Sequence, residues 1–154
     1  MQVVIAAVGK PRDRHLAAAI EEYERRARRY WPLDVIELRE ATARGVTPEQ
    51  ARERESTRIA ERIPEGADLI VCDETGQRMS SREFATLMGD FRTRARSVAF
   101  AIGGAFGVTS SLRERASRVL QLAPWTLPHE MARLVLAEQL YRAGTILRGE
   151  PYHK

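Results

Sequence analysis

Glycines follow one of the most apolar runs of this sequence. The run covers residues 98–102, and residues 103–107 read Gly-Gly-Ala-Phe-Gly. Glycine lacks a Cβ and allows positive φ and close approach of the backbone, so this is either a structural turn or a ligand-binding loop. The dinucleotide fingerprint fails at its second glycine and a P-loop lysine is missing, which argues against both nucleotide motifs. We expect ligand binding here, and we expect Gly103→Val to block the ligand while leaving the fold intact.

A second candidate segment lies between two prolines. Pro124 and Pro128 each fix φ and remove a backbone donor, so residues 121–129 should form a stiff loop. The remaining N–H and C=O groups of this loop are then free to meet a ligand such as the edge of an adenine. An ordinary strand-to-helix connector is the alternative.

Histidine is the side chain best suited to exchange a proton near neutral pH. Of the three histidines, His129 and His153 lie near the candidate segments, whereas His15 is expected on the surface of a helix. Glu138 and Arg142 are four residues apart and can pair across one helical turn, as helix support or as part of a site. No Ser-His-Asp or Cys-His set is evident.

The chain ends in Pro151-Tyr152-His153-Lys154. A terminus usually frays, and such a tail would ordinarily be dismissed as disordered. Its groups nevertheless suit RNA, because a tyrosine can stack on a base while histidine and lysine meet phosphate or a base edge. Arg133 and Arg142 are expected to assist as partners of phosphate or carboxylate.

Composition sets broad limits. The 154 residues suffice for one domain, spanning 1–154, that must bind cofactor and substrate together. The net charge of +4 fits either RNA binding or an arginine-rich solvated surface, and does not decide between them. The single cysteine, Cys72, excludes an internal disulfide and a metal cage and fits the cytoplasm. No run approaches the roughly 18 apolar residues of a membrane span.

Strand and helix patterns alternate along the chain. Apolar runs predict strands at 3–8, 34–38, 68–72, 98–102 and 119–122, with residues 73–76 as a loop. Helical patterns cover 14–30, 48–62, a segment opening at 80, 110–116 and 129–147, and capping boxes begin at Thr47 and Ser80. This alternation predicts an α/β fold, a parallel sheet with helices on both faces.

The last predicted helix is apolar almost all round. Such a helix must be buried on every side, which is more than one small domain provides. We therefore expect a partner subunit to cover it, with Leu136 and Leu140 in the subunit contact. A purely internal core helix is the alternative.

Together, the order of segments, the glycine turn, the Thr126-Leu127-Pro128-His129 segment and the Pro-Tyr-His ending resemble the SPOUT superfamily of methyltransferases, most closely the ribosomal RNA large subunit methyltransferase H family. The resemblance covers the whole chain. It implies a C-terminal trefoil knot, a homodimer and S-adenosylmethionine bound in a bent form, with no metal. Family members usually have leucine where this chain has Cys72, which suits an apolar wall.

Residue roles carried over by position fall into three groups. The cofactor contacts implied are Cys72, Gly103, Gly104, Leu122, Ala123, Pro124, Trp125, Thr126 and Leu127. The catalytic candidates are His129, Arg142, Tyr152 and His153. The RNA-binding candidates are Arg133, Tyr152, His153 and Lys154.

The resemblance implies N3-methylation of a pseudouridine in the helix 69 loop of 23S rRNA on the assembled 70S ribosome. Sulfonium methyl transfer needs no nucleophilic side chain, because the donor is already activated and the protein must align it with the acceptor. One alternative is a non-catalytic ribosome-associated RNA-binding factor, and another is a small-molecule methyltransferase on the same fold. Binding of the methyl donor separates the first alternative from an enzyme, and dependence on ribosomes separates the second.

Overall fold

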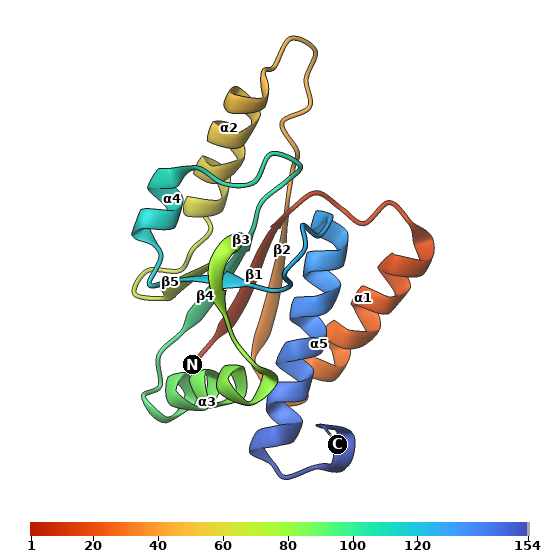
Figure 1. Ribbon diagram of the computed structural model, residues 1–154, viewed down its shortest axis with the longest axis vertical. Coiled ribbons are helices and arrows are strands. Elements are labelled where there is room, and N and C mark those ends of the chain that lie inside the picture. Colours follow the sequence, from red (N-terminus) through yellow and green to blue (C-terminus); the bar gives the residue numbers. More distant parts are fainter. Residues whose placement is uncertain (154) are drawn as a thin grey trace.

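The computed structural model describes residues 1–153, apart from the side chain of His153. Five parallel strands form one sheet in the order β2-β1-β4-β3-β5 (Figure 1). The strands are β1 (Val3–Val8), β2 (Leu33–Leu38), β3 (Asp68–Arg78), β4 (Val98–Ile102) and β5 (Arg118–Gln121). The helices are α1 (Arg14–Ala27), α2 (Pro48–Ala60), α3 (Ser81–Thr93), α4 (Ser110–Arg115), α5 (His129–Leu147) and the 3-10 turn η1 (Pro151–His153). The predicted α/β fold with a parallel sheet is confirmed.

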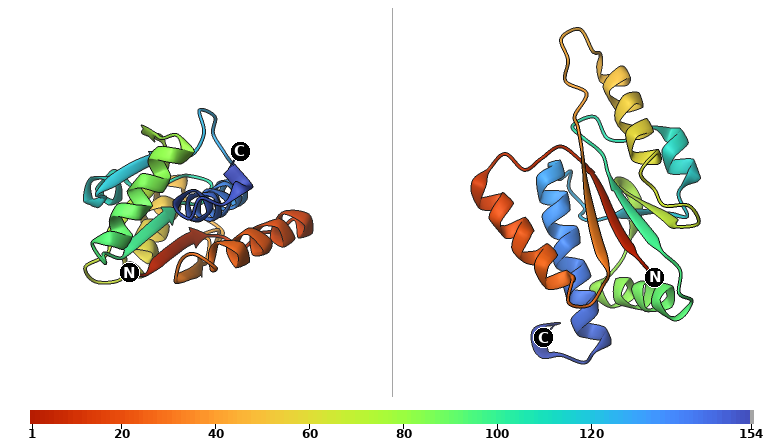
Figure 2. Two further views of the ribbon diagram at one scale, coloured as in Figure 1. Left: turned by 90° about the horizontal axis from the view of Figure 1, so that it is seen from below. Right: turned by 180° about the vertical axis from the view of Figure 1, so that it is seen from behind.

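Both faces of the sheet are covered by helices (Figure 2). Successive strand residues point to opposite faces, so Ile5 and Phe100 pack with α1, α3 and α5, whereas Ala6 and Ala101 pack with α2 and α4. Strands buried on both faces read as continuous apolar runs, which explains why β1 and β4 stand out in the sequence.

The helix starts follow local chemistry. Thr47 and Ser80 each form a complete capping box, with Gln50 and Glu83 as the reciprocal partners, as predicted. The end of α1 differs from the expectation, because the helix stops at Ala27 rather than Tyr30. Stopping there lets Trp31 enter the core, where its Nε1 donates to the Leu140 carbonyl at 2.7 Å.

The segment predicted as a loop after the third strand instead continues as strand. Cys72 and Gln77 both pair with Leu120 of β5, so the intervening residues bulge and β3 then resumes beside β5. Gly76 permits this close passage, since a Cβ there would lie 2.6 Å from the Leu120 carbonyl carbon. The polar residues 73–76 are thereby held by the sheet edge.

Helix α5 lies between α1 and α3 (Figure 1). Leu136 and Leu140 are fully buried inside the same chain, so the expectation that they form a subunit contact is wrong. Periodicity identified an apolar helix but could not tell which side faces its own sheet. The apolar side chains of α5 that remain partly exposed include Met131, Leu134 and Val135.

Arg133, assigned to RNA from the sequence, is instead an internal ion-pairing residue. Its Nε donates to Glu24 and its Nη1 to Glu37, both at 2.7 Å, and the side chain is 7% exposed. Burial alone would lower the pKa of Arg133, but these two hydrogen bonds outweigh it and raise the pKa. The guanidinium joins α5 to α1 and β2 and is not available to a phosphate.

We expect Arg133→Met to destabilise the protein by about 3–5 kcal/mol, because Glu24 is left buried without its partner. Urea unfolding followed by circular dichroism measures this. The control is Arg25→Met, which breaks the exposed Arg25–Glu22 pair and should leave the midpoint nearly unchanged. Equal midpoints for the two variants would contradict the structural role of Arg133.

Candidate functional site

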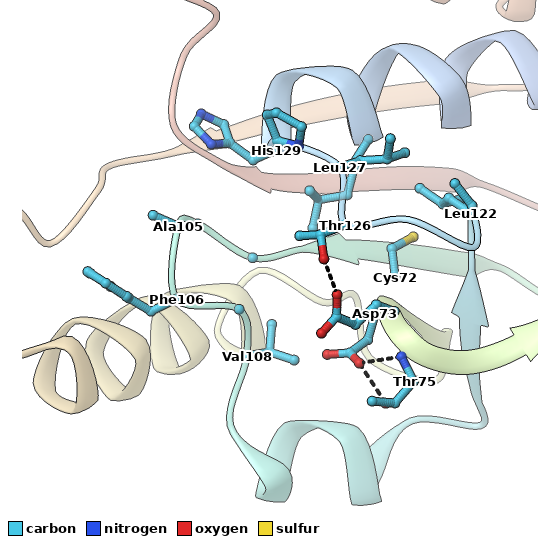
Figure 3. Close-up of a pocket in the computed structure, with 18 of the residues that line it drawn as sticks. Cys72, Asp73, Thr75, Ala105, Phe106, Val108, Leu122, Thr126, Leu127 and His129 are labelled. Carbon is cyan, nitrogen blue, oxygen red and sulfur yellow. Dashed lines mark hydrogen bonds between the residues drawn. The ribbon is translucent and has the colours of Figure 1, made fainter.

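A pocket of about 720 Å³ lies at the carboxyl end of β4, beside the bulge of β3 at residues 72–75. In open parallel sheets, ligands bind in this position, and this volume is within the roughly 300–1,000 Å³ of ligand pockets. Three segments supply most of its wall: residues 72–75, the glycine turn 102–108 and the loop 122–129 (Figure 3). Arg52 of α2 completes the rim.

The glycine turn packs tightly against itself. The Gly107 N–H donates to the Gly104 carbonyl at 3.1 Å, and Gly107 has a φ of +71°. A Cβ on Gly103 would lie 2.7 Å from the Gly107 carbonyl carbon and oxygen, and one on Gly104 would lie 2.6 Å from Glu55 Oε2. The expectation that Gly103→Val leaves the fold intact is therefore wrong, because the glycine is required by the chain itself.

One end of the pocket is apolar. Cys72, Leu122 and Leu127 pack against the core there and lie on the opposite side of Figure 3 from Phe106. Burial, reinforced by the charge of Asp73, raises the pKa of the Cys72 thiol to about 12. The thiol therefore stays neutral and acts as an apolar wall rather than a nucleophile.

Hydrogen bonds at Glu74 link residues 72–75 to the loop on the other side of the pocket. The Thr126 hydroxyl donates to the Glu74 carboxylate, and Gln121 Nε2 donates to the Glu74 carbonyl at 2.6 Å. Asp73 accepts from the N–H and hydroxyl of Thr75 at 2.9 and 2.6 Å. Burial alone would raise the pKa of Asp73, but the Thr75 hydrogen bonds and the nearby Arg113 lower it overall, so the carboxylate is charged.

Sequence reasoning missed several lining residues, namely Asp73, Glu74, Thr75, Arg52, Phe106, Val108 and Arg113. Polar residues at the carboxyl end of a buried strand were a usable signal for the first three. Nothing in the sequence pointed to Arg52, because it lies on α2, far along the chain. Pro124 is the one predicted cofactor contact that does not line the pocket.

The opening of the pocket carries exposed aromatic side chains. Trp125 is 77% exposed and Phe106 is 50% exposed, and both line the pocket. Arg52, beside them on the rim, makes no hydrogen bond or ion pair with the described residues. This end can receive a flat, anionic molecule.

His129 begins α5 at the pocket wall. Its Nε2 lies 3.7 Å from Glu40 Oε1, and its side chain is 21% exposed. In Figure 3 the ring points toward the side of Ala105 and away from Cys72. Of the sequence-predicted catalytic residues whose side chains the structure describes, His129 is the one that lines the pocket.

Arg142 and Tyr152 lie away from this pocket. The Tyr152 ring packs at a tilt of 56° against the Tyr141 ring, with 4.5 Å between their centroids, and the Tyr152 hydroxyl donates to Glu138 Oε1 at 3.0 Å. Arg142 pairs with Glu138 at 2.6 Å, as predicted, and lies over the Tyr152 ring. Glu138 is nine residues beyond His129, about 14 Å along the helix. Neither Arg142 nor Tyr152 lines the pocket of its own chain.

Two tail assignments, Lys154 and the side chain of His153, lie outside the described residues. Within the described part, no group of three or more His, Cys, Asp or Glu side chains is placed to hold a metal ion. No helix in that part combines the length and apolar character needed to cross a membrane.

Comparison with known proteins gives full-length matches. The family described as "Predicted SPOUT methyltransferase" matches residues 1–153. A protein of Gemmatimonas aurantiaca is 54% identical over 154 residues, covering 100% of both chains, and is called ribosomal RNA large subunit methyltransferase H. A protein of Geobacter metallireducens with the same name is 46% identical, covering 99% of both chains.

Solved structures show the same fold at low identity. A probable methylase family protein from Haemophilus influenzae superposes with a TM-score of 0.54 at 13% identity, covering 99% of this chain and 70% of that one. The methyltransferase Lpg2936 from Legionella pneumophila, described as putative and solved in complex with S-adenosylmethionine, gives a TM-score of 0.51 at 12% identity, covering 93% and 66%.

The glycine turn gives a matched test. Gly103→Ala should lower stability clearly, because the new Cβ overlaps backbone that cannot move independently. Gly107→Ala meets nothing within 4 Å and should cost only the roughly 1–2 kcal/mol of a left-handed residue. Urea unfolding of both variants checks this. The self-packed turn is contradicted if Gly107→Ala proves the more damaging of the two.

Proposed function

The chain belongs to the SPOUT methyltransferase family, and within it to the ribosomal RNA large subunit methyltransferase H family, and from this premise we propose that it methylates ribosomal RNA with S-adenosylmethionine as methyl donor. The observation that carries the proposal is the pocket at the end of β4 and the bulge of β3. The loops assigned to the cofactor from sequence converge there. The Legionella relative in fold was solved with S-adenosylmethionine.

The residues present fit this methyl donor. The backbone N–H groups of Leu122, Ala123, Trp125, Thr126 and Leu127 have no hydrogen-bond acceptor within the described chain. Unpaired backbone groups beside an apolar wall suit the edge and face of an adenine. Glu74 adds negative charge on the same side, which favours a cationic ligand.

When bound, the donor supplies an activated methyl group on sulfur. The task of this chain is then to hold that group in line with an acceptor nitrogen and to exclude water. The acceptor we propose is N3 of a pseudouridine in the helix 69 loop of 23S rRNA, presented by the assembled 70S ribosome in the cytoplasm.

We further propose a homodimer in which the tail of one subunit lies beside the donor pocket of the other and contacts the RNA there. The support is geometric, since Tyr152 is held at Glu138 and Tyr141 of its own helix, away from the pocket of its own chain. The partly exposed Met131, Leu134 and Val135 supply an apolar strip on the same helix. A second copy packed along α5 would cover this strip and bring a tail to each pocket.

Family membership also supports the expected C-terminal trefoil knot. The connection after β4 leads to α4 on one face of the sheet, and the connection after β5 leads to α5 on the other (Figure 1). Both connections line the pocket at the carboxyl end of β4.

Truncation after Gly149 tests the two steps of the proposed reaction separately. Calorimetric titration should show that parent and truncated protein bind S-adenosylmethionine with affinities within a few-fold, because the described tail residue Tyr152 does not line the pocket of its own chain. Tritium transfer to 70S ribosomes should occur with the parent and be severely reduced on truncation. Tyr152→Ala and His153→Ala should reproduce part of the loss, whereas His15→Ala on α1 is the matched control.

The other possible outcomes would each contradict one part of this proposal. Failure of the parent to bind the donor would favour the non-catalytic ribosome-associated factor. Transfer to a small molecule without ribosomes would contradict the RNA substrate. Full transfer by the truncated protein would remove the tail from the site, and a joint loss of binding and transfer would make the tail part of the donor pocket.

The dimer can be tested with neighbouring residues of α5. Val135→Arg, on the partly exposed side, should give a folded monomer of about half the parent's mass in light scattering, because a charge enters an apolar contact. Leu136→Arg should instead unfold the chain, since Leu136 is in the internal core. A parent protein that is monomeric at 17.4 kDa would disprove the dimer.

A further inference from the structure

Charged groups from three segments meet where α5 begins. Gly9 and Arg12 follow β1, Glu40 follows β2, and His129 is the first residue of α5. Arg12 Nη2 donates to Glu40 Oε2 at 2.5 Å, and the other oxygen, Oε1, lies 3.7 Å from His129 Nε2. The three side chains therefore form a line that leads from the surface to the pocket wall.

The inner end of this line is buried. His129 Nε2 is inaccessible to solvent and has no hydrogen-bond partner among the described residues. Buried polar atoms in proteins are nearly always paired, so an unpaired ring nitrogen facing a carboxylate needs an explanation. A movement of less than 1 Å would close the 3.7 Å gap to a hydrogen bond.

Gly9 leaves the room for this approach. Its φ is +87°, and a Cβ there would lie 2.7 Å from Glu40 Oε1 and 2.8 Å from His129 Nε2. A side chain at position 9 would therefore come between the carboxylate and the imidazole. The chain places a glycine, which has no side chain, at the point where these groups face each other.

The neighbouring charges leave Glu40 as the carboxylate for His129. Glu37 is bound by Arg133 at 2.7 Å and lies 4.0 Å from Lys10. Glu130 Oε1 accepts the Arg12 N–H at 3.0 Å. Glu40 Oε1 accepts no hydrogen bond from the described residues.

The ring's other nitrogen, Nδ1, also makes no hydrogen bond within the described chain, and it is not among the buried unpaired atoms. If the Nε2 proton is directed at Glu40, the lone pair of Nδ1 is free on the accessible side of the ring. A carboxylate that fixes one tautomer in this way prepares a histidine to accept a proton.

We propose that His129 is the proton acceptor of the methyl transfer, and that Glu40, oriented by Arg12, is the positioning residue that holds its productive tautomer. This inference rests on the proposed function. The N3–H bond of the base breaks and its proton passes to Nδ1 of His129. The nitrogen's electron pair forms the bond to the methyl carbon, and the carbon–sulfur pair remains on sulfur as the donor becomes S-adenosylhomocysteine. The imidazolium then releases the proton to solvent.

The first measurement uses the cofactor-free protein. The ¹⁵N NMR spectrum of His129 in the parent should show a protonated Nε2 and an unprotonated Nδ1 in the neutral ring. In Glu40→Gln the tautomers should mix, because the amide no longer demands a donor. Glu130→Gln is the matched control, since Glu130 binds Arg12 without facing His129, and it should keep the parent spectrum.

The second measurement is methyl transfer to 70S ribosomes across pH. His129→Ala should reduce the rate by about 10²–10⁴-fold and Glu40→Gln by at least ~10-fold, with donor affinity within a few-fold of the parent. Both deficits should shrink as pH rises, because the acceptor N3–H then dissociates without help. A merely structural defect would lower the rate equally at every pH.

The outcomes separate this inference from the proposed function. A parent that transfers no methyl group contradicts the proposed function, while the tautomer measurement still decides what Glu40 does. A parent that transfers, together with Glu40→Gln at the parental rate and with the parental tautomer, overturns the relay. If Glu40→Gln does not fold, Arg12→Met replaces it, since the Arg12 side chain is 75% exposed, and an unchanged tautomer and rate in that variant overturn the relay as well.

Discussion

Close backbone packing at the carboxyl edge of the sheet is the constraint on which the rest of the structure depends. The glycine turn after β4 folds onto itself at Gly103 and Gly107, and β3 passes β5 at Gly76 with no room for a side chain. These contacts bring three chain segments to one place and leave a pocket between them. Because backbone contacts fix the shape of the pocket, its side chains can provide an apolar end, carboxylates and an aromatic rim.

Helix α5 connects that pocket to the remainder of the molecule. Its first residue, His129, faces the pocket, its buried side packs on the sheet, and Arg133 ties it to α1 and β2. Its C-terminal half holds the tail through Glu138 and Tyr141. A single rigid helix therefore sets both the proposed proton acceptor and the proposed RNA-contacting tail, at a fixed distance from each other.

The same geometry fits the proposed homodimer. In one subunit the donor pocket and Tyr152 lie in different places. The pocket of a single subunit therefore lacks the tail group that the proposed reaction uses. Two copies along α5 would place a tail beside each pocket. The two arginines differ in the same way. Arg133 is paired with two carboxylates inside the subunit, whereas Arg52 on the pocket rim has no partner among the described residues.

The sequence by itself determined the parallel α/β fold, the capping boxes at Thr47 and Ser80, and the glycine turn as a candidate ligand loop, because apolar runs, caps and glycines are local signals. The family resemblance added the cofactor segments. Only the tertiary structure decided that Arg133 is buried between two carboxylates, that Leu136 faces its own core, and that Glu40 stands opposite His129. Those facts depend on which segments meet in space. The periodicity of a sequence does not show which charged residues pair, or which face of a helix packs against its own sheet.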